Sequence, residues 1–396
     1  MMILMKKLTR TLTLFVLVSV LMFALLSSAY AETNKKTQDF GQPVASSKVI
    51  LILAPFLTWD DITPQTTPAI YRAAEKGAVG DINARSRAKE DSGEPSITEG
   101  ALTVSAGAWA KVDNLAFSAY NVDERVDFDT AAQAYNRLTG NSLESQSIVY
   151  LGLPRIINAN AENTFNAIPG LLGSTIKKAG GYTAALGNSD LGYSTDTTLR
   201  LARPAALAAM DEKGAVDFGN ISESVLKRDG QAPYGVSTDI QKLTKSLENI
   251  RKQMPADKPG LVVLDSGDLY RAYNYNSVVT DKVSEKNWND ALSQLDDMYE
   301  MARSLYPNDT VILAAQASKD KEVDSEGFGP IVISNIKPGL LTSDSTQRAG
   351  LVTNLDLSAT ILDVLNIQQP VEVLGSSMES TTHYSVNVVG DEKDSS

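Results

Sequence analysis

The residue types available for chemistry are restricted, because the 396-residue chain has one histidine and no cysteine. A structural zinc site needs several cysteine or histidine ligands, and a Ser-His-Asp or Cys-His set needs a histidine on the packed scaffold. The single histidine, His383, lies in a polar segment near the C-terminus, which disfavours it as a catalytic base. Any chemistry must therefore use carboxylates, hydroxyls, amides, cations or backbone groups.

Polar and charged side chains follow several apolar segments in which we expect strands. The candidate ligand-binding residues among them are Trp59, Asp61, Asn188, Asp190, Asp265, Asp268 and Arg271. Each of them also fits a turn or the cap of a following helix. The pair Asp265 and Asp268 could bind Mg²⁺ or Ca²⁺ through oxygen ligands, although two carboxylates alone make a weak site and a solvated loop is the alternative.

Two other segments contain suggestive spacing. Residues 95–107 are rich in hydroxyls and glycine, which is typical of a helix start where free backbone N–H groups can hold an anion. Residues 320–327 (DKEVDSEG) are similar to a calcium-binding loop, but Ser325 stands where such a loop needs glycine. The sequence contains no P-loop, dinucleotide fingerprint or nucleophile elbow. No familiar motif of these kinds therefore assigns a function.

The elements that must position these residues alternate along the chain. Short apolar runs predict strands at 49–54, 182–186, 261–264, 311–315 and 331–334. Amphipathic or capped segments predict helices at 67–76, 170–179, 204–213, 238–254, 287–305 and 354–365. This alternation predicts an α/β fold, a three-layer α/β/α sandwich with a mainly parallel sheet. Ligands of such sheets bind at the carboxyl ends of the strands.

The N-terminus is typical of a targeting segment. A basic region with Lys6, Lys7 and Arg10 precedes an apolar stretch, and Ala29-Tyr30-Ala31 supplies a small-x-small cleavage pattern. We therefore predict a signal peptide over 1–31 and a secreted or extracytoplasmic protein. An uncleaved membrane anchor is the alternative, but the apolar run is short for a span of about 20 residues.

The rest of the sequence divides by composition. We predict a flexible tether at 32–47, one α/β domain at 48–380 with a possible insertion or cap at 113–168, and an acidic polar tail at 381–396. The formal net charge of −12 disfavours nucleic acid and anionic lipid as partners. The length of the chain is sufficient for an ordinary core without disulfides.

Three segments carry a resemblance to a known family. The run from Gly339 to Ile367 includes Asp356 and Thr360 at the start of its helix, in an Asp-x-x-x-Thr spacing. Together with the opening run 49–80 and the segment 96–107, it resembles the alkaline phosphatase superfamily. The resemblance implies an alkaline-phosphatase-like fold, and it places Thr98 where active members have their attacking Ser or Thr.

Departures from that family pattern concern the metal ligands. Active members hold two metal ions with Asp and His side chains, but Ala54 and the pair Ala315-Gln316 stand at positions where the resemblance expects ligands. A hydroxyl nucleophile without a metal or base to lower its pKa is a poor one. We therefore expect no metal ligands and no cofactor. Of the family's constellation, the resemblance leaves Thr98, the catalytic candidate, and one of Asp265 or Asp268.

Three functional hypotheses follow. The first is an exported, non-catalytic pseudoenzyme that binds a small anionic ligand or a cell-envelope component. The second is a residual phosphoester hydrolase or phosphotransferase that uses Thr98 with Mg²⁺ or Mn²⁺ held only by carboxylates, namely Asp60, Asp61, Asp265 and Asp268. The third is a secreted structural or adhesion domain, with 113–168 as its interaction surface. We favour the first.

Overall fold

The computed structural model describes residues 40–84, 96–112, 118–161, 164–193, 201–318 and 327–381. Several predicted features lie outside these residues. They are the signal peptide at 1–31, most of the tether at 32–47, most of the calcium-loop-like segment at 320–327, and nearly all of the acidic tail, including His383. Within the described residues, no helix is both long enough and apolar enough to cross a membrane.

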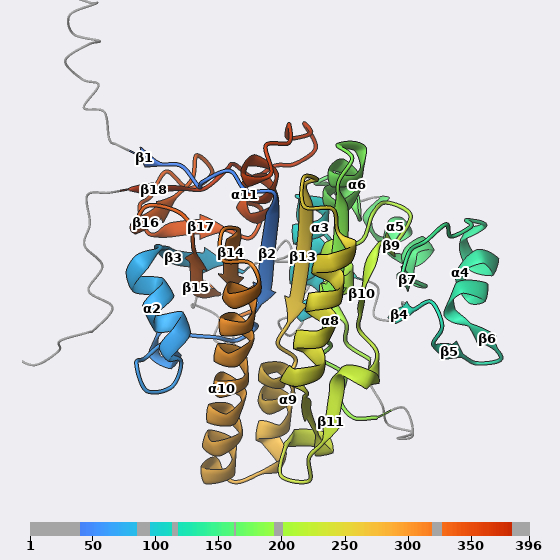
Figure 1. Cartoon of the computed structure of the whole chain (residues 1–396), viewed down its shortest axis with the longest axis horizontal. Helices are drawn as coiled ribbons and strands as arrows, with labels where there is room; N and C mark the ends of the chain where they lie inside the picture. Colours follow the sequence, from blue (N-terminus) through green and yellow to red (C-terminus); the bar gives the residue numbers. More distant parts are fainter. Residues whose placement is uncertain are drawn as a thin grey trace, which may run out of the picture. The chain divides into compact units, whose positions relative to one another are not determined.

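A large mixed sheet forms the centre of the fold (Figure 1). Its spatial order is β18 (Glu379–Thr381), β16 (Gly339–Thr342), β3 (Ala78–Asn83), β15 (Phe328–Ile333), β14 (Thr310–Ala314), β2 (Lys48–Leu53), β13 (Gly260–Asp265), β8 (Tyr182–Leu186) and β10 (Phe218–Asn220). β17 (Leu351–Thr353) also pairs with β3. The five strands from β14 to β10 run parallel, and β15 is antiparallel to both of its neighbours.

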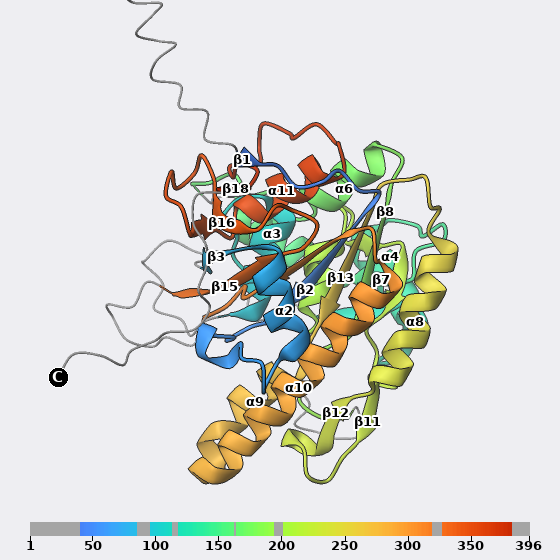
Figure 2. The same ribbon diagram turned by 60° about the vertical axis from the view of Figure 1, so that its left-hand side comes forward.

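The sheet is buried between two layers of helices (Figures 1 and 2). One layer contains α2 (Pro68–Lys76), α8 (Ile240–Gln253) and α10 (Asp281–Leu305), with α9 (Asp268–Tyr275) packed on α10. The other contains α3 (Ile97–Ala106), α6 (Leu171–Lys178), α7 (Pro204–Ala209) and α11 (Asp356–Val364). All six residues of β2 are buried, as its continuous apolar sequence requires. The predicted three-layer α/β/α sandwich with a mainly parallel sheet is confirmed.

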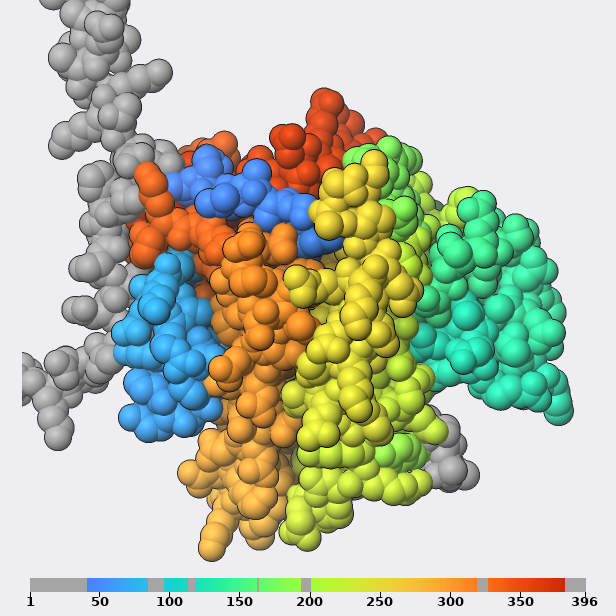
Figure 3. Space-filling view, viewed as in Figure 1, coloured from blue at the N-terminus to red at the C-terminus, as the bar shows by residue number. Residues whose placement is uncertain are grey.

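A second, small antiparallel sheet lies beside the central one. It consists of β4 (Ala119–Asn121), β7 (Ile148–Tyr150) and β9 (Ala215–Val216), accompanied by α4 (Ala131–Thr139), α5 (Leu153–Ala161) and the hairpin of β5 (Arg125–Val126) and β6 (Asp129–Thr130). Residues 118–161 make up most of this region, which projects from the main sheet (teal in Figure 3). It has its own apolar cluster, centred on Tyr135 and Val149.

The remaining elements are short. They are β1 (Phe40–Gly41), β11 (Leu226–Arg228), β12 (Val236–Thr238) and the 3₁₀ turns η1 (Trp59–Asp61), η2 (Glu223–Val225), η3 (Pro233–Gly235) and η4 (Asn276–Val278). β11 and β12 pair as an antiparallel hairpin.

The helix predicted at 204–213 is shorter in the structure and ends at Ala209. The carboxylate of Asp211 accepts the backbone N–H groups of Lys213 and Ala215, which closes a turn. Gly214 has a φ of 74°, in the left-handed region that glycine adopts readily. The side chain of Asp211 therefore redirects the chain into β9 before a further helical turn can form.

Candidate functional site

The carboxyl ends of the parallel strands meet at one edge of the sheet. Leu53 at the end of β2 is in register with Asp265 of β13 and with Ala314 of β14, and Leu186 of β8 is in register with Leu264. The polar residues predicted to follow these strands are thereby brought to the same edge. Trp59, Asp61 and Thr98 belong to elements next to it.

Asp265 is the last residue of β13, and its side chain is fully buried. The hydroxyl of Ser189 donates to its carboxylate oxygens at 2.9 and 2.8 Å, and the backbone N–H of Gly267 donates at 3.1 Å. Burial raises the pKa of Asp265 to about 7, even though these hydrogen bonds and Arg271 favour the charged form. Asp265 is therefore part of the interior at this edge.

Arg271, on α9, is fully buried beside Asp268. Its Nη2 donates to Asp268 Oδ1 and to the hydroxyl of Thr238, both at 3.0 Å. Its Nη1 donates to the carbonyls of Asn188 and Asp190 at 3.1 and 3.3 Å. Arg271 thus connects the segment after β8 to the start of α9, so its guanidinium has a structural role.

Asp190 and Asn188 are equally enclosed. Arg203 is 3% exposed, and it donates to the Asp190 carboxylate through Nε and Nη2 and to the Glu124 carboxylate through Nη1 and Nη2. Burial raises the pKa of Asp190, although the Arg203 charge opposes this shift. The Asn188 amide donates to the carbonyls of Ile221 and Ser222. These contacts join β8 to the small sheet, because Arg203 also donates to the carbonyl of Ala119 in β4.

Trp59 and Asp61 lie in η1, beyond the end of β2. The indole of Trp59 donates to Asp81 of β3 at 2.6 Å. Asp61 accepts the backbone N–H and the hydroxyl of Thr58 through one oxygen and the indole of Trp288 through the other. This arrangement agrees with the alternative prediction from the sequence, in which these residues belong to a turn rather than to a ligand-binding site.

Thr98 occupies the first turn of α3, where its hydroxyl lies 2.8 Å from that of Ser96, the residue that caps the helix. Gln316, just beyond β14, packs on the same turn, since a Cβ built on Gly100 would lie 2.2 Å from the Gln316 carbonyl oxygen. The Gln316 side chain is fully buried, and neither of its amide atoms has a hydrogen-bond partner among the described residues. Such a group costs about 1–3 kcal/mol, and it is the strongest sign of an incomplete polar site at this edge.

We expect Gly100→Ala to destabilise the protein by about 1–3 kcal/mol, because the new methyl group would collide with the Gln316 backbone. Alanine normally stabilises a helix by about 1 kcal/mol relative to glycine, so the sign of the change is informative. Urea unfolding measures it. Gly230→Ala is the matched control, since a Cβ there meets nothing within 4 Å; equal or greater stability of Gly100→Ala would contradict the close contact.

An apolar cluster occupies the space beyond the end of β2. Phe56, Ile97, Ala202 and Ala317 are buried together, and Tyr270, Tyr273 and Trp288 pack against them. Phe56 has a φ of 66°, which is unusual for a bulky residue. Its backbone N–H donates to the Ala317 carbonyl at 2.7 Å, and its ring stacks on Tyr273 with centroids 4.0 Å apart. These contacts hold an aromatic side chain beside the carboxyl ends of β2 and β14.

The described residues do not fit the two-metal centre that the resemblance implies for active relatives. Ala54 is buried and its backbone N–H donates to the Ala314 carbonyl. Asp265, Asp268 and Asp190 are bonded to Ser189, Arg271 and Arg203. Within the described part of the chain, no group of three or more His, Cys, Asp or Glu side chains is placed to hold a metal ion.

Several residues of this edge had no distinct signal in the sequence. Ser189, Thr238, Arg203 and Gln316 take part in it through contacts between distant segments. Gln316 is the exception, because the resemblance already marks it as standing where the family pattern expects a ligand.

No protein-family model and no curated protein matches the chain. The solved structures that it is similar to include a protein in the alkaline phosphatase superfamily from Vibrio parahaemolyticus, at 13% identity over 85% of this chain and 71% of that chain, with a TM-score of 0.47. They also include the lipoteichoic acid synthase LtaP from Listeria monocytogenes (12% identity, 85% and 78% covered, TM-score 0.44) and the alkaline phosphatase from the Antarctic bacterium TAB5 (11% identity, 83% and 100% covered, TM-score 0.43).

Proposed function

We propose that this chain is an exported, alkaline-phosphatase-like protein that binds an anionic ligand or an envelope component without metal-dependent catalysis. Its N-terminal sequence is the basis for export, since a basic region, an apolar stretch and Ala29-Tyr30-Ala31 follow one another there. The order of its sequence segments, described above, is the basis for relating it to that superfamily.

The internal use of the carboxylates carries the non-catalytic part of the proposal. Asp190, Asp265 and Asp268 are buried and bonded to Arg203, Ser189 and Arg271. To bind two metal ions, those carboxylate oxygens would have to be free of their present partners. Further ligands would be needed at positions 54 and 316, where Ala54 and Gln316 supply neither a carboxylate nor an imidazole. A carboxylate-only site for Mg²⁺ or Mn²⁺ would have to break the same hydrogen bonds.

The first turn of α3 supports the binding part of the proposal. Backbone N–H groups at a helix N-terminus attract anions. The Thr98 hydroxyl is hydrogen-bonded to that of Ser96 in this turn. Gln316, whose backbone packs on the same turn, has a buried side-chain amide without a partner among the described residues. An anionic group bound there would satisfy donors that the described residues leave unpaired. Thr98 would then act as a hydrogen-bonding residue rather than as a nucleophile.

Metal quantitation and substrate turnover test this function. We expect the purified protein to contain no stoichiometric Mg²⁺, Mn²⁺ or Zn²⁺, and to hydrolyse phosphomonoesters, phosphodiesters and sulfate esters no faster than buffer with each metal added. Enzymes typically accelerate reactions by about a million-fold or more, so turnover by a working phosphoesterase would stand far above the rate in buffer. Metal-dependent turnover that disappears in Thr98→Ala would refute the proposal and establish the residual hydrolase instead.

A further inference from the structure

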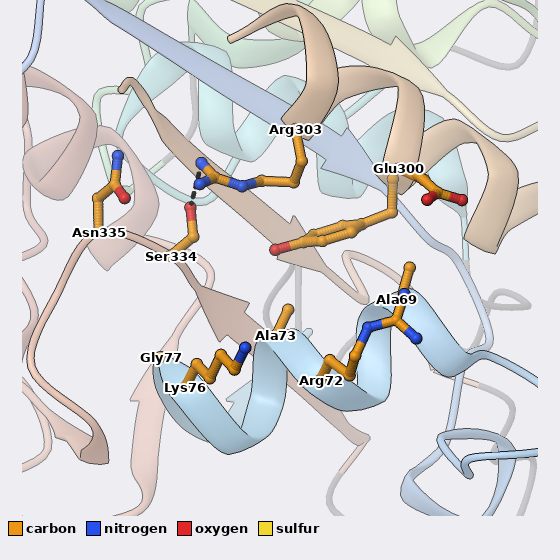
Figure 4. A pocket seen from close by; sticks show the side chains of 10 residues that line it. Ala69, Arg72, Ala73, Lys76, Gly77, Glu300, Arg303, Ser334 and Asn335 are labelled. Atoms are coloured by element: carbon orange, nitrogen blue, oxygen red, sulfur yellow. Dashed lines mark hydrogen bonds between the residues drawn. The ribbon is translucent and has the colours of Figure 1, made fainter. Parts of the chain in front are cut away.

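A second polar site lies at the opposite edge of the sheet. A cavity of about 330 Å³ is lined by α2, α10 and the residues that follow β15 (Figure 4). Ala78 of β3 is in register with Ile333 of β15, and Ile333 with Ile312 of β14. The cavity residues Gly77 and Ser334 therefore adjoin the amino-terminal ends of β3 and β14, whereas Thr98 and Asp265 belong to the carboxyl edge.

The lining of this cavity is cationic. Arg72 and Lys76 project from α2, and Arg303 projects from α10 across from them (Figure 4). None of the three forms an ion pair with a carboxylate among the described residues. Glu300 is the one acidic residue in the lining, and it lies at the end of the cavity away from Asn335. Three cations around one opening are notable on a chain whose formal net charge is −12.

The nearest buried carboxylate is already engaged. Asp296 of α10 attracts Arg72, but its two oxygens accept the backbone N–H groups of Ala69 and Ile70 at 2.9–3.1 Å. It therefore caps the first turn of α2, where a negative charge is favourable. Among the described residues Asp296 and Arg72 interact through their charges but form no ion pair, so the donors of the Arg72 guanidinium can still bind an anion.

Fixed donors line the inner part of the cavity. The Arg303 guanidinium is held by hydrogen bonds to the carbonyls of Pro307 and Asp309 and to the hydroxyl of Ser334, at 3.0–3.3 Å. Tyr299 is 2% exposed, and its hydroxyl lies beside the Ser334 side chain without a hydrogen bond of good geometry. Burial raises the pKa of Tyr299 to about 12, so the hydroxyl keeps its proton and can donate at neutral pH. A buried hydroxyl whose hydrogen bond has poor geometry is stabilised by a better-placed acceptor.

From this arrangement we infer that the cavity binds a small anion through a tetrahedral oxyanion group, a phosphate or a sulfate. A tetrahedral oxyanion offers several acceptor oxygens to donors that converge from different elements, and guanidinium groups suit it especially well. Lys76 and Arg72 supply charge at the opening. Arg303 supplies a fixed positive charge, with only its Nε–H and one Nη2 hydrogen left to donate. The Tyr299 hydroxyl supplies a further donor. The volume accommodates the group together with a small organic portion. This inference is independent of the function proposed for the α3 edge.

Calorimetric titration with inorganic phosphate and with sodium sulfate, against sodium chloride at the same ionic strength, tests the site. We expect saturable binding of phosphate or sulfate that Lys76→Gln and Arg72→Gln each weaken about tenfold, the loss typical of one charge-assisted hydrogen bond. Tyr299→Phe should also weaken the binding of the anion relative to the wild-type protein, although this substitution changes no charge. Lys252→Gln is the matched control, because Lys252 is an exposed lysine of α8 outside the cavity.

The relative affinities for phosphate and sulfate distinguish the two kinds of ligand that could carry the anionic group. Preference for phosphate indicates a phosphorylated ligand, and preference for sulfate indicates a sulfated one. Absence of saturable binding, or binding that Lys76→Gln and Lys252→Gln weaken equally, overturns the inference. Binding that Thr98→Ala removes and Lys76→Gln does not would also overturn it, while assigning the anion to the first turn of α3 as the proposed function requires.

Discussion

Arg203→Met is expected to destabilise the protein by about 3–5 kcal/mol, the usual cost of removing one partner from a buried ion pair. The substitution leaves the Asp190 carboxylate, whose side chain is 2% exposed, without its guanidinium donors. It also releases Glu124 and the Ala119 carbonyl, so the small sheet loses a connection to β8. Urea unfolding followed by circular dichroism measures the change.

A second substitution separates the buried charge from the loss of packing. Asp190→Asn removes the carboxylate that Arg203→Met leaves unpaired, so the double variant should regain part of the lost stability. Glu124 is 21% exposed at its side chain and can be solvated. Arg251→Met is the control, because Arg251 is exposed on α8. If the double variant is as unstable as the sum of the two single ones, the charge explanation is wrong.

The second large effect is a pH dependence of stability caused by Asp265. The pKa of this carboxyl is about 7 in the folded protein because the group is buried, whereas in the unfolded chain it is about 3.9. The folded state therefore binds the proton more tightly, and the contribution of Asp265 to stability is greatest below about pH 4. It decreases as the pH rises from about 4 to about 7, by up to about 1.4 kcal/mol for each pH unit.

Asp265→Asn isolates this contribution. Its amide cannot ionise, so the stability of the wild-type protein relative to the variant should fall by about 3–4 kcal/mol between pH 4 and pH 7 and level off above that range. Urea unfolding of both proteins at a series of pH values provides the difference, in which contributions common to both proteins largely cancel. A difference that is constant over this range would mean that Asp265 is charged in the folded state throughout.

The architecture was predictable because its signals are local. The run VILILA at 49–54 is continuous and β-branched, which predicts a strand buried on both faces, and β2 is such a strand. Pro68 at the first helical position and Gly77 after the last one delimit α2 correctly. The antiparallel direction of β15 could not be read in this way, because the sequence IVIS at 331–334 is equally suited to either direction.

The candidate site was predictable in position and less so in character. Asp265 and Asn188 were expected near the sheet edge because they follow strands, and the register of the parallel strands puts both there. Their partners were not predictable, since Ser189 reaches Asp265, and Asn188 reaches the Ile221 carbonyl, only after the chain has folded. The sequence does not distinguish an aspartate whose carboxylate is free to bind a ligand from one whose carboxylate is paired with a buried arginine.

The central position of β2 also constrains the order in which the molecule can assemble. β2 begins at Lys48, but its two neighbours are β13, which begins at Gly260, and β14, which begins at Thr310. Synthesis proceeds from the N-terminus, so this apolar strand stays unpaired until most of the chain has left the ribosome. Contacts so distant in sequence form slowly. β2 therefore takes its place in the sheet only after the segments that form β13 and β14 have been synthesised.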